Sequence, residues 1–310
     1  MRMPTPSRVS WFAVAALGWL AVAPAAADDA PSVVVSIAPL HSLVAGVMGD
    51  VGTPQLIVRG RASPHGYQMR PSQAAALNRA DLVVWVGGAL EGFLKRPLAR
   101  LDATTRVIEA MAIDDMLLLD ARAAGVWRDD DDHDHDDGPD DPHVWLSPAN
   151  AAHMARHVAQ QLAALDPANG ATYAANAETL TARLAALDRD LAAKLATVAD
   201  RPFILLHDST RYFVHHYGLN AVGAITVSPE HPPSARRLRR LRAAIARLGV
   251  RCVFSEAQFE SAMVRTVIEG TGARASVIDP LAGTFAPGPD AYFQMMESVA
   301  EVMASCLSEG

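Results

Sequence analysis

Cysteine is almost absent from this sequence of 310 residues, which contains only Cys252 and Cys306. Two cysteines so far apart are a weak signal for a structural zinc site, which usually takes closely spaced pairs. The sequence is also short of positive charge, with 27 Lys and Arg against 34 Asp and Glu. The net charge of -7 argues against nucleic acid as a partner, because binding to phosphates needs a basic surface.

Long apolar runs are missing too, apart from one short stretch near the N-terminus. Residues 9–22 are uncharged and apolar except for Ser10 and Gly18, follow Arg2 and Arg8, and precede three alanines at 25–27. This order is typical of a cleavable secretory signal peptide, and the stretch is short for a membrane span of about 20 residues. We therefore expect a signal peptide at residues 1–27 and, because no cysteine lies at the cleavage site, no lipid anchor.

The two cysteines both fall in the exported part of the chain. An exported protein with an even pair is expected to join them in a disulfide, which contributes about 2 to 4 kcal/mol. Two unpaired buried thiols, or two metal ligands, are the alternatives.

Short apolar runs, separated by helical segments, recur in two series along the chain. They lie at residues 33–37, 55–58, 82–86 and 107–108, and then at 203–206, 219–225, 252–254 and 275–278. Continuous apolar runs of this kind are typical of parallel sheets that are covered on both faces. The sequence therefore predicts an α/β protein with two lobes, each a mainly parallel sheet flanked by helices.

A long helix is expected between the two series. Apolar residues recur at steps of three and four from Tyr173 to Val198, which is the pattern of one buried helix face. We therefore expect an N-terminal lobe at 28–167, a rigid connecting helix at 168–200 and a C-terminal lobe at 201–310.

Residues 129–148, DDDDHDHDDGPDDPHVWLSP, are the most informative stretch. Its acidic first part, 129–141, is too charged to bury, and it contains His133 and His135, which we interpret as a weak metal site. A scavenging tail or a solvated linker is the alternative. Pro142 then restricts the backbone and Ser147-Pro148 begins a helix, so His143 lies in a short stiff segment. An imidazole held in this way is a candidate metal ligand.

Three more candidate ligands are expected near His143. His207 and Asp279 each end a predicted strand of the C-terminal lobe, and His65 lies in a loop after a strand of the N-terminal lobe. Ligands of open α/β sheets bind beyond the carboxyl ends of the strands, so the four residues are expected to meet between the lobes. Three imidazoles and one carboxylate suit Zn(II), whereas manganese and calcium prefer more oxygen.

Five motifs then occur in a recognisable order. They are ASPHGYQMRPS at 62–72, ADLVVWVG at 80–87, DPHVWLSP at 141–148, LHD at 206–208 and IDPL at 278–281. Together they resemble the zinc-binding solute-binding proteins of bacterial ABC importers, the high-affinity zinc uptake type. The resemblance covers nearly all of the mature chain.

The resemblance implies a periplasmic carrier, not an enzyme, that binds Zn(II) and hands it to an ABC permease in the membrane. In that family the metal is bound at the positions of His65, His143 and His207. A carboxylate at the position of Asp279, or a water molecule, completes the shell. Manganese-binding relatives tend to have Glu where this chain has His207, which favours zinc. We expect a monomer, and the resemblance also suggests a disulfide within the C-terminal lobe.

Two other functions fit part of the sequence. One is a manganese or iron carrier, or a surface adhesin, of the same fold. The other is a zinc hydrolase, because three histidines and an open position also describe a catalytic site. A hydrolase needs a general base close to the bound water. Glu230 and Glu256 are candidates to approach the expected cleft, but neither belongs to a catalytic motif.

Overall fold

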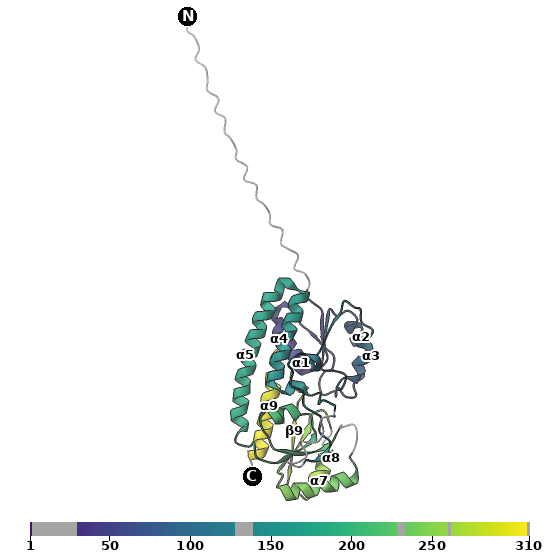
Figure 1. The fold of residues 1–310 in the computed structure, drawn as a ribbon, viewed down its shortest axis with the longest axis vertical. Coiled ribbons are helices and arrows are strands. Elements are labelled where there is room, and N and C mark those ends of the chain that lie inside the picture. The colour runs from purple at the N-terminus through teal and green to yellow at the C-terminus, as the bar shows by residue number, and fades with distance from the viewer. Residues whose placement is uncertain (2–29, 128–138, 228–232, 260–261, 309–310) are drawn as a thin grey trace.

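The chain folds into two α/β lobes stacked along one long helix, α5 (Gly170–Leu195) (Figure 1). The computed structural model describes residue 1 and residues 30–127, 139–227, 233–259 and 262–308. The predicted signal peptide and the stretch with His133 and His135 therefore lie outside the described residues. None of the helices described is both long and apolar enough to cross a membrane.

The first sheet has four parallel strands in the order β2-β1-β3-β4. They are β1 (Val33–Val35), β2 (Gln55–Leu56), β3 (Leu82–Trp85) and β4 (Arg106–Glu109). Every residue of the central strands β1 and β3 is buried, as their continuous apolar sequences predict. Helix α1 (Ala38–Met48) lies on the side of α5, while α2 (Pro71–Leu77) and α3 (Lys95–Leu98) lie on the other side (Figure 1).

The second sheet has five strands in the order β5-β7-β6-β8-β9. They are β5 (Gly125–Val126), β6 (Phe203–His207), β7 (Ala221–Thr226), β8 (Cys252–Glu256) and β9 (Arg274–Ile278). All neighbours are parallel except β5, which pairs antiparallel with β7. Strand β5 was not expected, so the range 28–167 expected for the N-terminal lobe contains one strand of the second sheet. The α/β class with two mainly parallel sheets is confirmed.

The central strands β6 and β8 are buried on both faces of the second sheet. Successive residues of a strand point in opposite directions, so each strand contributes to two different cores. On β6, Phe203 and Leu205 join the main core of the protein, whereas Ile204 and Leu206 join a smaller cluster. The smaller cluster is completed by α7 (Ala235–Leu248) and α8 (Ala262–Ile268). Helices α6 (Arg211–His216) and α9 (Ala291–Ser308) contribute to the main core instead.

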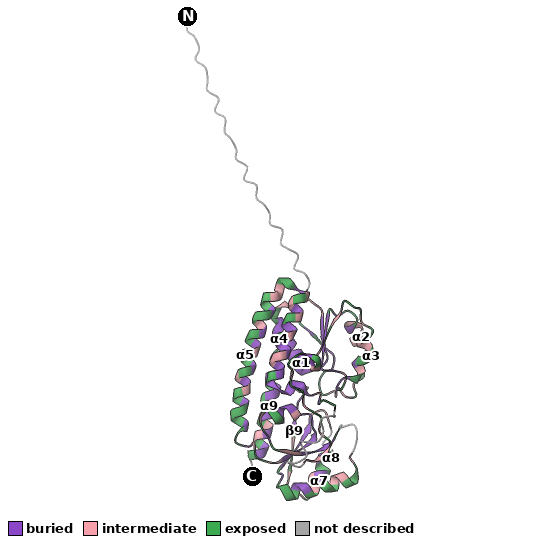
Figure 2. Cartoon of the chain, viewed as in Figure 1, coloured by how far each residue is buried: buried purple, intermediate pink, exposed green. Residues whose placement is uncertain are grey.

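Helices α4 (Pro148–Leu165) and α5 form a hairpin along one side of the molecule (Figure 1). Helix α4 begins where the sequence predicts, because the Ser147 side chain accepts a hydrogen bond from the backbone N of Asn150. Helix α5 has 26 residues, and its apolar side chains from Tyr173 to Leu195 are buried at steps of three and four. Figure 2 shows the exposed residues of α5 along its outer side.

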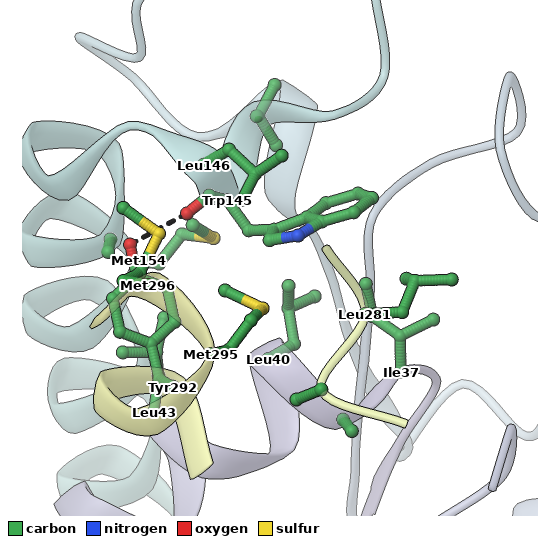
Figure 3. Packing of buried hydrophobic residues seen from close by; sticks show 14 of the residues in the cluster. Ile37, Leu40, Leu43, Trp145, Leu146, Met154, Leu281, Tyr292, Met295 and Met296 are labelled. Atoms are coloured by element: carbon green, nitrogen blue, oxygen red, sulfur yellow. Dashed lines mark hydrogen bonds between the residues drawn. The ribbon is translucent and has the colours of Figure 1, made fainter. Parts of the chain in front are cut away.

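The main hydrophobic core runs from one lobe into the other without a break. The C-terminal helix α9 joins the two lobes, because its buried side chains belong to the same core as those of α1. The backbone N of Tyr292 also donates a hydrogen bond to Ser42 Oγ of α1 at 2.9 Å. The Tyr292 hydroxyl donates to the carbonyl oxygen of Trp145 at 2.8 Å. Met295 of α9 lies beside Leu40 of α1 (Figure 3). The two lobes are therefore held together by packing as well as by the connecting chain.

The two cysteines form the predicted disulfide, between the start of β8 and the end of α9. Unpaired thiols and metal ligation are thus both excluded for Cys252 and Cys306. The bond closes a loop with a sequence separation of 54 residues. In the chain-entropy model, a loop of this size stabilises the folded state by about 4 kcal/mol.

Glu91 anchors the end of β3 from a fully buried position. Its Oε2 accepts hydrogen bonds from the backbone N of Val86 at 2.8 Å and of Gly87 at 3.1 Å. Burial raises the pKa of Glu91 to about 7, because the charged form is poorly solvated there. The folded state therefore binds this proton more tightly than the unfolded state.

Replacing Glu91 with Gln should make the protein more stable at pH 8. The contribution of protonated Glu91 is complete below pH 4.5 and is lost as pH rises through 7, so the free energy of unfolding should fall over that range. Gln cannot ionise, and we expect Glu91→Gln to exceed the wild type by up to about 3 kcal/mol at pH 8. Urea unfolding at pH 5 and pH 8 measures the difference. The control is Glu178→Gln, on the exposed side of α5, and an equal or lower stability of Glu91→Gln at pH 8 would contradict the argument.

Candidate metal site

Three histidines from distant parts of the chain lie close together. His65 lies in the loop between β2 and α2, and His143 immediately precedes the short 3-10 helix η5 (Val144–Leu146). His207 is the last residue of β6 in the second sheet. One potential ligand nitrogen from each lies within 4.8 Å of the other two. Three of the four side chains that were expected to meet therefore lie close together in the structure.

The imidazole rings are close to the geometry of a shared metal. Their centroids are 5.7 Å apart for His65 and His143, 5.3 Å for His65 and His207, and 5.0 Å for His143 and His207. In a tetrahedral zinc site the ligand nitrogens are about 3.3 Å apart, given Zn–N distances of about 2.0 to 2.1 Å. A small approach of the three rings would thus bring them to bonding distance. His143 and His207 are buried, and His65 is half-buried.

A carboxylate orients the ring of His143. Asp141 Oδ1 accepts hydrogen bonds at 2.9 Å from both the backbone N and Nδ1 of His143. Burial alone would raise the pKa of Asp141, but His143 and the hydrogen bonds from it hold the pKa below its usual value. An ionised carboxylate only accepts hydrogen bonds, so Nδ1 carries the proton and the lone pair of Nε2 is left for a metal.

A second carboxylate orients the ring of His207. Glu256 Oε1 lies 3.2 Å from His207 Nδ1, and both side chains are buried. Burial alone would lower the pKa of His207, but Glu256 raises it above the usual value, with a further contribution from Asp141. The contact has a simple cause, because β6 and β8 are parallel neighbours with Leu205 opposite Phe254. Two residues further along, the same register brings His207 opposite Glu256.

A small cavity beside the histidines is lined largely by apolar residues. This cavity of about 10 Å³ lies beside His65 and His143, and Leu90, Trp145 and Leu281 are among the residues that line it. That volume is on the scale of a single water-sized guest. Trp145 is fully buried, packs edge-on against His143 with centroids 5.3 Å apart, and donates from Nε1 to the Pro280 carbonyl oxygen.

Asp279, the fourth expected ligand, lies outside the group of three histidines. Its Oδ1 accepts hydrogen bonds from Gln258 Nε2 at 2.8 Å and from the backbone N of Leu281 at 3.3 Å. Its Oδ2 accepts two more, both at 2.7 Å, from the backbone N and Oγ1 of Thr284. The carboxylate is thus engaged in organising the turn that follows β9.

Sequence reasoning missed the roles of Asp141 and Glu256. Asp141 belongs to the DPHVWLSP motif, and its position two residues before His143 was the available signal. Glu256 ends a strand beside the strand that His207 ends, and it was considered only as a general base. Glu230, the other acid considered for that role, lies outside the described residues, as do His133 and His135.

The arrangement can bind one divalent transition metal. Three imidazole nitrogens, two of them directed by carboxylates, are the donors that Zn(II) prefers, and they leave a fourth position open. In the part of the chain that the structure describes, no other group of three His, Cys, Asp or Glu side chains has this geometry.

Comparison with known proteins agrees with this site. Residues 33–306 match the family model described as the periplasmic component A of the zinc-uptake complex, ZnuA. The high-affinity zinc uptake system protein ZnuA of Brucella suis is 38% identical over 315 residues, covering 91% of this chain and 93% of that protein.

Two solved structures have the same fold over nearly all of this chain. A crystal structure of ZnuA has a TM-score of 0.76 and 28% identity, covering 90% of this chain and 99% of the other. A zinc-bound deletion mutant of ZnuA has a TM-score of 0.77 and 28% identity, covering 91% and 100%. This chain belongs to the ZnuA family of periplasmic zinc-uptake components.

Proposed function

We propose that this protein captures one Zn(II) ion with His65, His143 and His207 in the cleft between its lobes and delivers it to the ABC permease of a zinc importer. The convergence of three imidazoles from both lobes within 4.8 Å is the observation that carries the proposal. Membership of a family of zinc-uptake components supports the delivery step. Binding and release, without chemical conversion, are then the whole of its activity.

Zinc is favoured over manganese by the type of donor. Three nitrogens converge on the site, whereas Mn(II) is better served by carboxylates and water. Water is the better candidate for the fourth position, because both oxygens of Asp279 already accept hydrogen bonds that ligation would disturb. Asp279 would then act on the site through the turn that it organises.

The hydrolase alternative has little support. Glu256, one of the two acids considered as a general base, is buried and hydrogen-bonded to His207. The ZnuA family consists of solute-binding proteins, not enzymes.

Replacing His143 with Ala should abolish tight zinc binding. We expect the wild type to bind one Zn(II) per chain and the variant to lose at least about 100-fold in affinity, since loss of an outer hydrogen-bond partner alone costs about 10- to 100-fold. Metal analysis and competition with a chromophoric chelator measure both quantities. His157→Ala on α4 is the control, because His157 is a partly buried histidine that is not in the group. Tight one-to-one binding by His143→Ala would contradict the proposal.

Replacing Asp141 with Asn should weaken zinc binding without removing a ligand. Asn keeps the oxygen that faces His143 Nδ1 but loses the charge that makes the imidazole more basic. We expect a loss of about 10- to 100-fold in affinity. Asp140→Asn, a change at the adjacent exposed residue, serves as the control. Equal affinities for the two variants would mean that the carboxylate does not act on the site.

Zinc affinity should fall as the pH is lowered from about 7.5 to 5, because protons compete for the imidazole lone pairs around a pKa of about 6.5. The nearby Glu256 raises the pKa of His207 against the effect of burial, so this competition should begin at a higher pH than for an ordinary histidine. Glu256→Gln should therefore move the fall to lower pH. Titrations of both proteins with Zn(II) across this range provide the test, and an affinity independent of pH would argue against imidazole ligation.

A further inference from the structure

The loop that carries His65 is held at its ends but has an exposed segment between them. Arg59 Nε donates to the Leu56 carbonyl oxygen at 3.1 Å, and the Tyr67 hydroxyl donates to the Ile57 carbonyl oxygen at 3.2 Å. Gly60 and Arg61, near the start of the loop, are exposed to solvent. Outward movement of this segment would therefore meet no packed core.

A braced turn of the C-terminal lobe faces that segment. The turn comprises residues 279–285, and Asp279 accepts the four hydrogen bonds described above from Gln258, Leu281 and Thr284. The backbone N of Phe285 adds a bond to the Ala282 carbonyl oxygen at 3.2 Å. Ala282 is buried and has a φ of 54°, which shows how closely the surroundings determine this backbone.

The two segments meet backbone to backbone at Gly283. A Cβ atom on Gly283 would lie 2.3 Å from the Gly60 carbonyl oxygen and 2.9 Å from its carbonyl carbon. It would also lie 3.4 Å from Arg61 Cα. These are main-chain atoms that cannot rotate away, so a side chain at position 283 would push the segments apart. Gly283 does not have a positive φ, so close approach is the reason that the position needs glycine.

We infer that Gly283 is a positioning residue for the metal: the braced turn 279–285 bears on Gly60 and Arg61 and so determines where His65 lies relative to His143 and His207. The inference rests on the proposed function, because the proposed function is what assigns His65 as a ligand. Asp279 contributes by bracing the turn.

The same contact accounts for how a ligand on a loop can be placed accurately enough for zinc. Metal–ligand distances tolerate only about ±0.2 Å. The carboxylates on His143 and His207 orient those rings locally, whereas the loop of His65 is supported from the opposite lobe at Gly283.

The test compares Gly283→Ala with Gly288→Ala in zinc competition against a chromophoric chelator. Gly288 is in the same lobe, has no positive φ, and would bring its Cβ within 4 Å of nothing. We expect Gly283→Ala to bind zinc at least about 10-fold more weakly, the scale of a disturbed outer contact, and Gly288→Ala to match the wild type. Wild-type affinity for Gly283→Ala would overturn the inference.

A double-mutant cycle with His65→Ala identifies the route of the effect. If Gly283 acts through His65, Gly283→Ala should cost little further affinity once His65 is absent. An equal loss in both backgrounds would show that the contact acts elsewhere. Should Gly283→Ala not fold, as judged by circular dichroism, Thr284→Val takes its place, because it removes one hydrogen bond that braces the turn. Its loss of affinity should also vanish in the His65→Ala background, and a loss that persists there would equally overturn the inference.

The cycle also separates this inference from the proposed function. Wild-type zinc affinity in His65→Ala would refute the proposed ligand set itself. A weakened His65→Ala beside an unaffected Gly283→Ala would refute only the positioning role.

Discussion

The hydrophobic core shared by both lobes is the interaction on which the metal site depends. Two candidate ligands belong to the N-terminal lobe and one to the C-terminal lobe, so their separation is a property of how the lobes pack. Helix α9 joins the core of α1 and bonds to Trp145 through Tyr292. Trp145 in turn packs on His143 and bonds to the turn after β9. Any large rotation of the lobes would break this buried network, which favours small adjustments on binding.

Buried carboxylates make the second contribution to the site. Burying the carboxylates of Asp141 and Glu256 is unfavourable unless each is paired, and each is paired with one of the candidate ligand histidines. The pairing sets the tautomer of both rings before any metal arrives. The rings of His143 and His207 are thus oriented in advance. Binding of a metal therefore loses no free energy in fixing their orientation.

The sequence predicts local features well and non-local ones less well. Continuous apolar runs indicated the central strands, and Ser147-Pro148 indicated the start of α4. His207 could be proposed as a ligand because it ends a predicted strand, and His65 and His143 because they lie in restrained segments outside the strands. Strand β5 could not be predicted in this way. Its two residues form a strand only by pairing with β7, which comes much later in the sequence and belongs to the other expected lobe. The partner of His207 required the register of β6 and β8, and the role of Gly283 required the distance to Gly60, neither of which leaves a local pattern.

The cystine that joins β8 to α9 links the stability of the C-terminal lobe to cellular compartment. In a reducing cytoplasm the two sulfurs remain thiols, and the chain lacks about 4 kcal/mol of stabilisation, which enlarges its unfolded fraction about a thousandfold. Formation of the disulfide in the periplasm restores this stabilisation and lowers the unfolded fraction again. The protein therefore reaches its full resistance to unfolding only in the compartment where its family takes up zinc.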